Sequence, residues 1–260
     1  MIIKSYAKIN LDFKILDKMP NGYHNISSVF QAVSLHDLIT VTKIENGFQL
    51  SGSMVCPAED NLITRTRKKL EDYAGKNLPC AIQLIKSIPI GAGLGGGSSN
   101  AASVLVGLNE LYSLDIEKNV LIKIGAEVGS DIPFFISNKK TAFVEGIGEQ
   151  IKLSQRKISR YYVLARPHKR IDTADMYKKH DETKKSFFEL ASEICPDVEK
   201  MHNYFSLASN EVGMSGSGPT IFAGFDDYNK AAESIEKYGI KKFNGDFFIC
   251  EPTAGTYEIM

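Results

Sequence analysis

The chain has 260 residues, enough for one large domain or for two modest domains that share a cleft. Hydrophobic residues make up 43% and charged residues 24%, as in ordinary globular proteins, and Lys plus Arg balance Asp plus Glu at 31 each. The balanced charge argues against broad nucleic-acid binding, which needs a cationic surface, and the lack of an apolar run of about 18 residues argues against a membrane span.

The N-terminal segment predicts a strand with one face on a core. Residues 2–16 alternate between apolar and polar side chains, which is the period of a half-buried strand. Lys8 and Asn10 share its polar face, and on pattern alone such a face would point to solvent. A Pro-Asn-Gly turn at residues 20–22 follows.

The pattern predicts further elements in two groups, separated by the polar segment 154–160. The first group begins with two strand-like runs within 26–44 divided at His36 and Asp37, a helix over 61–73, a strand over 81–85 and a helix over about 98–112. It continues with a helix over 120–128, whose short apolar run could also be a strand, and with strands over 141–144 and 150–153. The second comprises strands over 161–165, 220–225 and 247–250, with helices across 173–210 and 228–238 between them. We therefore predict an α+β protein with domains 1–155 and 156–260.

The most informative stretch is the glycine-rich loop at residues 89–99, PIGAGLGGGSS. Five glycines in seven residues allow positive φ and close backbone approach, so that their N–H groups can converge on an anion. An Ala-rich helix follows, with Ser98 or Ser99 as its expected N-cap, and its positive end would favour a phosphate. A flexible linker would not be followed at once by such a helix.

Two other loop types fit these glycines less well. A Walker A loop would need lysine where Gly97 stands. The spacing of Gly91, Gly93 and Gly96 satisfies the dinucleotide fingerprint G-x-G-x-x-G, but no clear strand ends in an acidic residue about 20 positions later. The loop thus favours a phosphate site of another kind.

Asp131, in the run GSDIPFF, is a candidate for proton transfer. A carboxylate beside Ile-Pro-Phe-Phe needs partners if it is buried, although a helix-capping role is an open alternative. Phosphoryl transfer to an alcohol needs a proton acceptor near the attacking oxygen and positive charge near the transferring group. Asp131 and Lys8 could supply both, because an ammonium favours the ionised carboxylate and can orient a hydroxyl.

The loop, the AKINL run around Lys8 and the GSDIP run around Asp131 together resemble the GHMP kinase superfamily. The run GLGGGSSNAA resembles the variant found in its diphosphocytidyl-methylerythritol kinases, and the resemblance covers residue 6 to about residue 225. It implies an N-terminal ATP-binding domain like domain 2 of ribosomal protein S5 and a ferredoxin-like C-terminal domain. It also implies ATP-dependent phosphorylation of the 2-hydroxyl of 4-diphosphocytidyl-2-C-methyl-D-erythritol, a step of the non-mevalonate isoprenoid route.

The resemblance also implies roles for single residues. Lys8 would be the orienting cation and Asp131 the general base. The implied substrate-binding residues are Asn10, Tyr23 stacking on cytosine, His24 bonding the edge of that base, Thr173, and Tyr177 as the second stacking aromatic. The implied ATP-binding residues are Asn61, Leu62, Lys86, Pro89, Ile90, Gly91, Ala92, Gly93, Leu94, Gly95, Gly96, Gly97, Ser98 and Ser99. Mg²⁺ would accompany ATP, held by phosphates, water and Ser99 rather than by a set of protein ligands.

Simpler explanations exist for several of these runs. Residues 21–24, NGYH, could be a turn with a surface aromatic, and Asp60 could be the N-cap of the helix over 61–73. Residues 213–220 resemble the third GHMP motif but could be a purely structural turn. Family members often carry Phe where this chain has Tyr177, and the tyrosine keeps the aromatic ring at that position.

Three other functions stay open from the sequence. They are another GHMP small-molecule kinase of the mevalonate or homoserine type, a nucleotide-binding protein without catalysis, and an NAD-dependent oxidoreductase. The cytosine-type run at residues 22–24 argues against the first, and the presence of both Lys8 and Asp131 argues against the second. We expect small-molecule partners only, with no nucleic acid and no membrane, and a monomer or weak homodimer.

The cysteines bear on the compartment. Cys56, Cys80, Cys195 and Cys250 form no C-x-x-C pair and have no histidine cluster near them, which predicts unpaired thiols in a reducing compartment. The N-terminus reads as a strand and lacks the apolar stretch of a signal peptide. We therefore expect a cytoplasmic protein.

Overall fold

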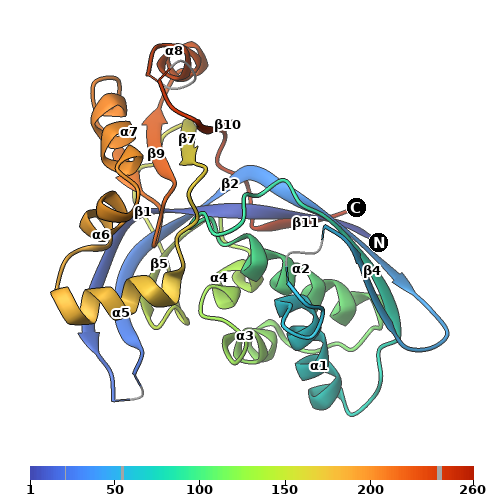
Figure 1. The fold of residues 1–260 in the computed structure, drawn as a ribbon. Helices are drawn as coiled ribbons and strands as arrows, with labels where there is room; N and C mark the ends of the chain where they lie inside the picture. Colours follow the sequence, from blue (N-terminus) through green and yellow to red (C-terminus); the bar gives the residue numbers. More distant parts are fainter. Residues whose placement is uncertain (21, 54–55, 239–241) are drawn as a thin grey trace.

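Two antiparallel-rich sheets organise the chain, described here by a computed structural model for residues 1–260 except 21, 54–55 and 239–241 (Figure 1). The first sheet has the order β11-β1-β2-β4-β3, with β5 paired to β2 and β6 to β5, and the second has the order β10-β7-β9-β8. The strands of the first sheet are β1 (Ile2–Lys18), β2 (His24–Lys43), β3 (Phe48–Gly52), β4 (Cys80–Ile85), β5 (Thr141–Gly146), β6 (Gln150–Leu153) and β11 (Tyr257–Ile259). Those of the second are β7 (Tyr161–Pro167), β8 (Val212–Met214), β9 (Ile221–Phe225) and β10 (Gly245–Cys250).

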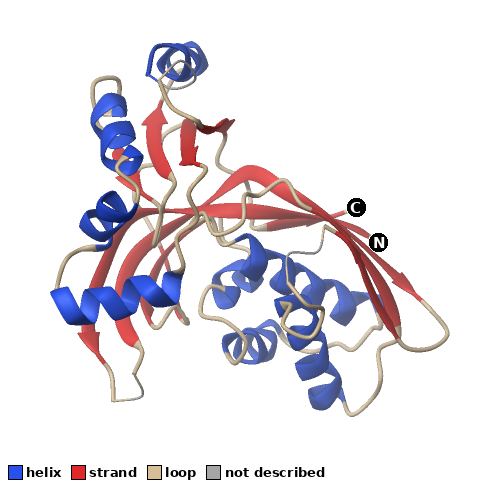
Figure 2. Ribbon diagram, viewed as in Figure 1, coloured by secondary structure: helices blue, strands red, loops and turns tan. Residues whose placement is uncertain are grey.

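Helices cover one side of the first sheet and flank the second (Figure 2). The first group is α1 (Leu62–Ala74), α2 (Gly96–Leu111), α3 (Lys118–Ala126) and α4 (Ile132–Ser137); the second is α5 (Thr173–Thr183), α6 (Phe187–Ile194), α7 (Asp197–Phe205) and α8 (Tyr228–Tyr238). The Ala-rich helix α2 is central, because Ala101 and Ala102 let it approach the sheet closely while Leu105 and Leu108 fill the core. Among the described residues, no helix combines the length and apolarity needed to span a bilayer.

The long hairpin of β1 and β2 joins the two halves. The strands pair antiparallel from Ile2 opposite Thr40 to Lys18 opposite His24, and Figure 1 shows them running from the sheet region above α1–α4 to the region behind α5. The prediction of two separate strands within 26–44 is wrong. Instead β2 is continuous, and His36 lies opposite Tyr6 at a register shift. The next pair is Ala7 opposite Val33, so a bulge takes up Ser34 and Leu35 without ending the strand.

The remaining predicted elements occur close to their expected positions, with corrections at the helix starts. The N-cap of α1 is Asn61, whose side chain accepts from the Ile63 N–H at 3.0 Å, and not Asp60. Helix α2 begins at Gly96 after the left-handed Gly95, so neither Ser98 nor Ser99 caps it. Both β3 and the six-residue α4 were unpredicted, because each is too short to show a clear period.

Besides the core of each half, a separate cluster of buried side chains lies between the two halves. It contains Ile9 and Leu11 from β1, Leu164 from β7 and Phe222 from β9. The chain also returns at its end, since β11 pairs with β1. Residues 257–259 therefore pair within the first sheet, and the division into domains 1–155 and 156–260 stays a prediction.

Candidate active site

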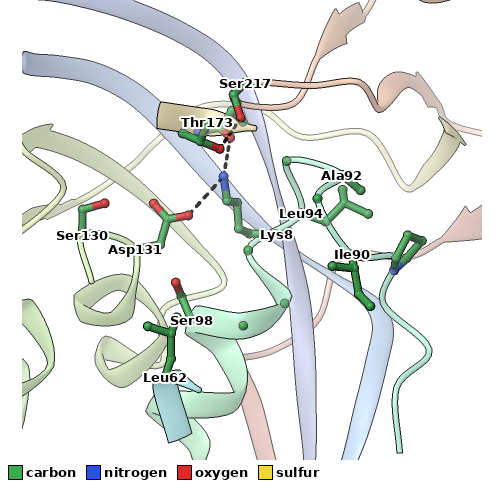
Figure 3. A pocket seen from close by; sticks show the side chains of 18 of the residues that line it. Lys8, Leu62, Ile90, Ala92, Leu94, Ser98, Ser130, Asp131, Thr173 and Ser217 are labelled. Atoms are coloured by element: carbon green, nitrogen blue, oxygen red, sulfur yellow. Dashed lines mark hydrogen bonds and ion pairs between the residues drawn. The ribbon is translucent and has the colours of Figure 1, made fainter. Parts of the chain in front are cut away.

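A cavity of about 360 Å³ lies where β1, the glycine-rich loop and the starts of α1, α2, α4 and α5 meet (Figure 3). Most of the predicted site residues line it, although they come from segments far apart in the sequence. The predicted residues that line the cavity are Lys8, Asn10, Asn61, Leu62, Lys86, Pro89, Ile90, Gly91, Ala92, Gly93, Leu94, Gly95, Gly96, Gly97, Ser98, Asp131, Thr173 and Tyr177.

Lys8 and Asp131 form an ion pair inside this cavity. Lys8 is only 4% exposed, so its strand face is buried and not solvated, and its Nζ lies 3.5 Å from Asp131 Oδ2. The ammonium also donates to Asn10 Oδ1 at 2.6 Å and lies 4.7 Å from the centre of the Phe30 ring. Three groups thus fix the ammonium from different sides.

Asp131 precedes α4 but makes no side-chain capping bond to it. Its carboxylate points into the cavity towards Lys8, as Figure 3 shows, and its side chain keeps 27% of its exposure. The capping alternative therefore does not describe this residue. A partly exposed carboxylate next to a buried ammonium can accept a proton from a ligand hydroxyl.

The glycine-rich loop is held against the loop at residues 213–220. Gly93 has φ +74°, and a Cβ there would come within 2.1 Å of the Ser215 carbonyl oxygen, so only glycine fits. Ser215 Oγ donates to the Gly93 carbonyl at 2.8 Å and accepts from the Asn10 N–H at 3.2 Å. The third motif is thus a clamp that joins the loop to β1.

The first turn of α2 presents a site for an anion. The first N–H groups of any helix lack intrahelical acceptors, and here Gly96, Gly97 and Ser98 supply them along the cavity wall. Ser99 departs from its prediction. It is fully buried, its hydroxyl donates to the Tyr6 carbonyl at 2.6 Å, and its side chain points away from the cavity.

Lys86 has buried partners that sequence reasoning missed. Its Nζ lies 2.5 Å from Asp37 Oδ2 and donates to Asn100 Oδ1 at 3.1 Å. Asp37 is fully buried and also accepts from the Ser87 and Ile88 N–H groups at 2.7 and 2.8 Å. The ammonium is therefore fixed beside the start of α2, and a charged residue inside an apolar strand was the only sequence signal for Asp37.

Tyr23 and His24 do not line the cavity. His24 packs against Tyr177, however, and Tyr177 does line it. The His24 ring stacks on Tyr177 at 5.0 Å with an interplanar angle of 20°, and its Nε2 lies 2.7 Å from Asp181 Oδ1. Tyr23 is 59% exposed at the surface. Asn21, the first residue of that run, lies outside the described residues.

Asp181 was also missed by sequence reasoning. Hydrogen bonds from Lys18 and His24 lower the pKa of its carboxyl to about 2. The carboxylate therefore stays ionised and holds the His24 ring in place at neutral pH. Because Asp181 engages Nε2, Nδ1 is the His24 ring nitrogen that a ligand could contact.

The wall formed by α5 and α6 completes the cavity. The Thr173 and Ser217 hydroxyls lie 2.7 Å apart and link the start of α5 to the clamp loop (Figure 3). Burial raises the pKa of the Tyr177 hydroxyl, and the nearby charge of Asp131 adds to the shift, so this hydroxyl stays neutral. Phe13 and Phe187, which stack at 5.5 Å, also line the cavity and were not predicted.

The comparisons with known proteins agree with this geometry. The profile of the GHMP kinases N terminal domain matches residues 61–139. A 4-diphosphocytidyl-2-C-methyl-D-erythritol kinase of Polynucleobacter asymbioticus is 36% identical over 250 residues, covering 87% of this chain and 84% of the relative. A protein of the same name from Clostridium botulinum is 31% identical over 279 residues, covering 96% of this chain and 99% of the relative.

Solved structures show the same likeness. A crystal structure of a 4-(cytidine 5'-diphospho)-2C-methyl-D-erythritol kinase superposes with a TM-score of 0.79 at 25% identity, covering 96% of this chain and 99% of that chain. A homoserine kinase from Cytophaga hutchinsonii superposes with a TM-score of 0.76 at 13% identity, covering 100% of this chain and 97% of that chain. The second likeness concerns the fold alone.

Proposed function

Since the chain belongs to the 4-diphosphocytidyl-2-C-methyl-D-erythritol kinase family of the GHMP kinases, we propose that it phosphorylates the 2-hydroxyl of 4-diphosphocytidyl-2-C-methyl-D-erythritol with ATP. The products are the 2-phosphate and ADP, and the step belongs to the non-mevalonate isoprenoid route. The protein is an ATP-dependent small-molecule kinase with the two-domain α+β fold of the GHMP kinases, as predicted. The observation that carries the choice of chemistry is the Lys8–Asp131 pair beside the glycine-rich start of α2.

The residues of the cavity suggest how the transfer proceeds. The backbone N–H groups at Gly96–Ser98 would bind the triphosphate and direct its γ-phosphorus towards Asp131. The substrate oxygen attacks that phosphorus, its proton passes to the Asp131 carboxylate, and the bond to the β-phosphate oxygen breaks to release ADP. Lys8 orients the attacking hydroxyl and places positive charge beside the transferring group.

We propose that Mg²⁺ accompanies ATP, where it would neutralise charge on the β- and γ-phosphates. Of the described residues that line the cavity, Asp131 is the only carboxylate, and Lys8 already pairs with it. Nor does any group of three or more His, Cys, Asp or Glu side chains in the described part of the chain suit a metal ion. The ion would therefore be held by phosphates and water, with the Ser98 hydroxyl, which lines the cavity, as the candidate protein ligand in place of Ser99.

The cytidine end of the substrate would lie towards Tyr177. The Tyr177 ring lines the cavity and packs against His24 and Phe187, so a cytosine would contact the part of this ring that borders the cavity or the exposed ring of Tyr23. His24 could bond the base through Nδ1, because Asp181 occupies Nε2. We further propose a cytoplasmic location, which the free cysteines support, and a monomer or weak homodimer.

A substrate comparison tests the proposal. ADP release is followed in a coupled assay with the cytidylylated methylerythritol, mevalonate and homoserine as acceptors at equal concentration. We expect turnover with the first acceptor alone. Faster turnover with mevalonate or homoserine would assign the chain to another GHMP substrate class, and no turnover with any acceptor would favour a non-catalytic nucleotide-binding protein.

A further inference from the structure

The last residues of the chain pack between the two elements that carry the catalytic pair. The strand β11 pairs with β1, with Tyr257 opposite Ser5, so it lies beside the strand of Lys8. Just before it, the Tyr6 N–H donates to the Thr256 carbonyl at 3.0 Å. Thr256 is thus fixed to β1 two residues from Lys8.

The same residue is bonded to α4. The Thr256 hydroxyl donates to the Phe135 carbonyl at 2.5 Å, and its N–H donates to Asn138 Oδ1 at 2.7 Å. Phe135 lies in α4 four residues after Asp131, and Asn138 is the left-handed C-cap of that helix. Thr256 therefore satisfies acceptors at the C-terminal end of α4 while its carbonyl holds β1.

The packing around this contact leaves little freedom. Thr256 is fully buried, and a Cβ on the neighbouring Gly255 would come within 2.2 Å of Asn138 Oδ1. Helix α4 has only six residues, so its own hydrogen bonds hold it weakly and a shift at its end would be passed on to Asp131. The 3.5 Å separation of Lys8 Nζ and Asp131 Oδ2 thus depends on how α4 is docked.

We propose that Thr256 is a positioning residue for phosphoryl transfer, because it fixes Asp131 of the α4 segment relative to Lys8 of β1. The inference rests on the proposed roles of these two residues. Thr256 itself lies outside the cavity lining and touches neither the nucleotide nor the alcohol site. Its effect should therefore appear in kcat and not in substrate binding, since misplacement of a catalytic group by a fraction of an ångström slows the reaction step.

The test compares variants of the full-length protein in the ADP-release assay. Thr256→Val removes the hydroxyl with almost no change of shape, and we expect kcat to fall roughly tenfold or more while the KM values for ATP and alcohol stay close to wild type. Thr256→Ser retains the hydroxyl and should recover most of the rate. Thr253→Val is the matched control, because it removes a bond of 2.6 Å to the Gly255 carbonyl in the same segment without touching α4.

If the melting temperature shows that Thr256→Val folds poorly, a second variant tests the same proposal. Gly255→Ala keeps every hydrogen-bonding group but forces the segment away from Asn138, and it should lower kcat in the same way. Normal kcat in a folded Thr256→Val protein, or in Gly255→Ala where the valine variant does not fold, would overturn the proposal. The proposal would also be overturned if Thr256→Ser showed the same loss of kcat as Thr256→Val, or if the control Thr253→Val lost kcat to the same extent.

Measuring the wild-type protein in the same assay distinguishes a failure of the Thr256 proposal from a failure of the proposed function. Its choice of acceptor tests the substrate, whereas the ratio of each variant to wild type tests Thr256. That ratio can be measured with whichever alcohol the wild-type kinase accepts.

Discussion

Lys8 can be buried because Asp131 and other groups of the site surround its charge. The ammonium is nearly inaccessible to water and is held by a carboxylate, an amide oxygen and an aromatic face. Burying a charge without such partners would be strongly unfavourable, so the polar face of β1 can be buried only where the rest of the site is assembled. The local sequence determined that Lys8 and Asn10 share a face, and their burial came from the fold.

Asp131→Asn tests the proposed base. The amide fills the same space but cannot accept the substrate proton, so we expect kcat to fall by about 10²- to 10⁴-fold. ATP affinity should persist, because the phosphate-binding N–H groups belong to α2. Turnover by ADP release and the ATP-induced rise in melting temperature measure the two quantities, and a near-wild-type rate would remove Asp131 from this role.

Lys86→Met tests the buried pair behind the loop. The variant leaves the fully buried Asp37 carboxylate without its cation, and we expect a loss of about 3 to 5 kcal/mol in the free energy of unfolding. Urea unfolding measures the loss. The double variant Asp37→Asn with Lys86→Met should be more stable than Lys86→Met alone, and a double variant that is no more stable would show that the charge is not the cause.

At the scale of elements, the glycine-rich loop and α2 act as one unit. Gly93 and Gly95 adopt positive φ, which turns the chain sharply into the helix, whereas Gly97 has ordinary helical geometry inside it. The last glycine therefore serves a different purpose from the first two. Among the described residues, an added Cβ at Gly97 would meet only Leu62 Cδ1, at 3.5 Å.

Gly97→Ala should separate stability from nucleotide binding. Alanine in a helix is favoured over glycine by about 0.5 to 1 kcal/mol, so urea unfolding should show a gain in stability. ATP affinity should nevertheless fall, because the methyl group would occupy the space through which a phosphate approaches the backbone. Gly93→Ala is the contrasting variant and should lose stability, since its Cβ would collide with the Ser215 carbonyl. Unchanged ATP binding in Gly97→Ala would argue that phosphate does not approach α2 there.

At the scale of the whole molecule, several weakly acidic hydroxyl and thiol groups are partly or fully buried, which makes its stability sensitive to alkaline pH. Burial raises the pKa of Tyr6 to about 12, helped by its bond to Glu258, and burial raises the pKa of Cys80 to about 11. Tyr162 is fully buried, and its pKa is raised by burial and by the charge of Glu211. Each of these groups holds its proton more tightly in the folded chain than in the unfolded one.

Tyr162→Phe tests the consequence. Because the folded pKa exceeds the unfolded value of about 10, the contribution of Tyr162 to stability is complete below pH 10 and is lost as the pH rises beyond it. We expect the free energy of unfolding of the wild type to fall above that pH more steeply than that of the variant, by about 1.4 kcal/mol per pH unit for one proton. Denaturant unfolding at a series of pH values measures both slopes, and parallel curves above pH 10 would contradict the prediction.

Local patterns in the sequence determined the regular elements, the phosphate-binding character of the loop and the family, because periodicity, glycine placement and short motifs are properties of neighbouring residues. They also indicated most residues of the cavity. Patterns did not indicate the roles of Asp37, Asp181 or Thr256, since each role depends on a contact with a residue many positions away in the sequence.

Only the tertiary structure decided which polar groups are buried together. It joined β2 into one strand, returned β11 to β1, turned Ser99 away from the cavity and left His24 beside it with Asp181. The physical reason is that the free energy of a buried charge or hydroxyl depends on the groups that surround it in space, and the local sequence carries no record of them.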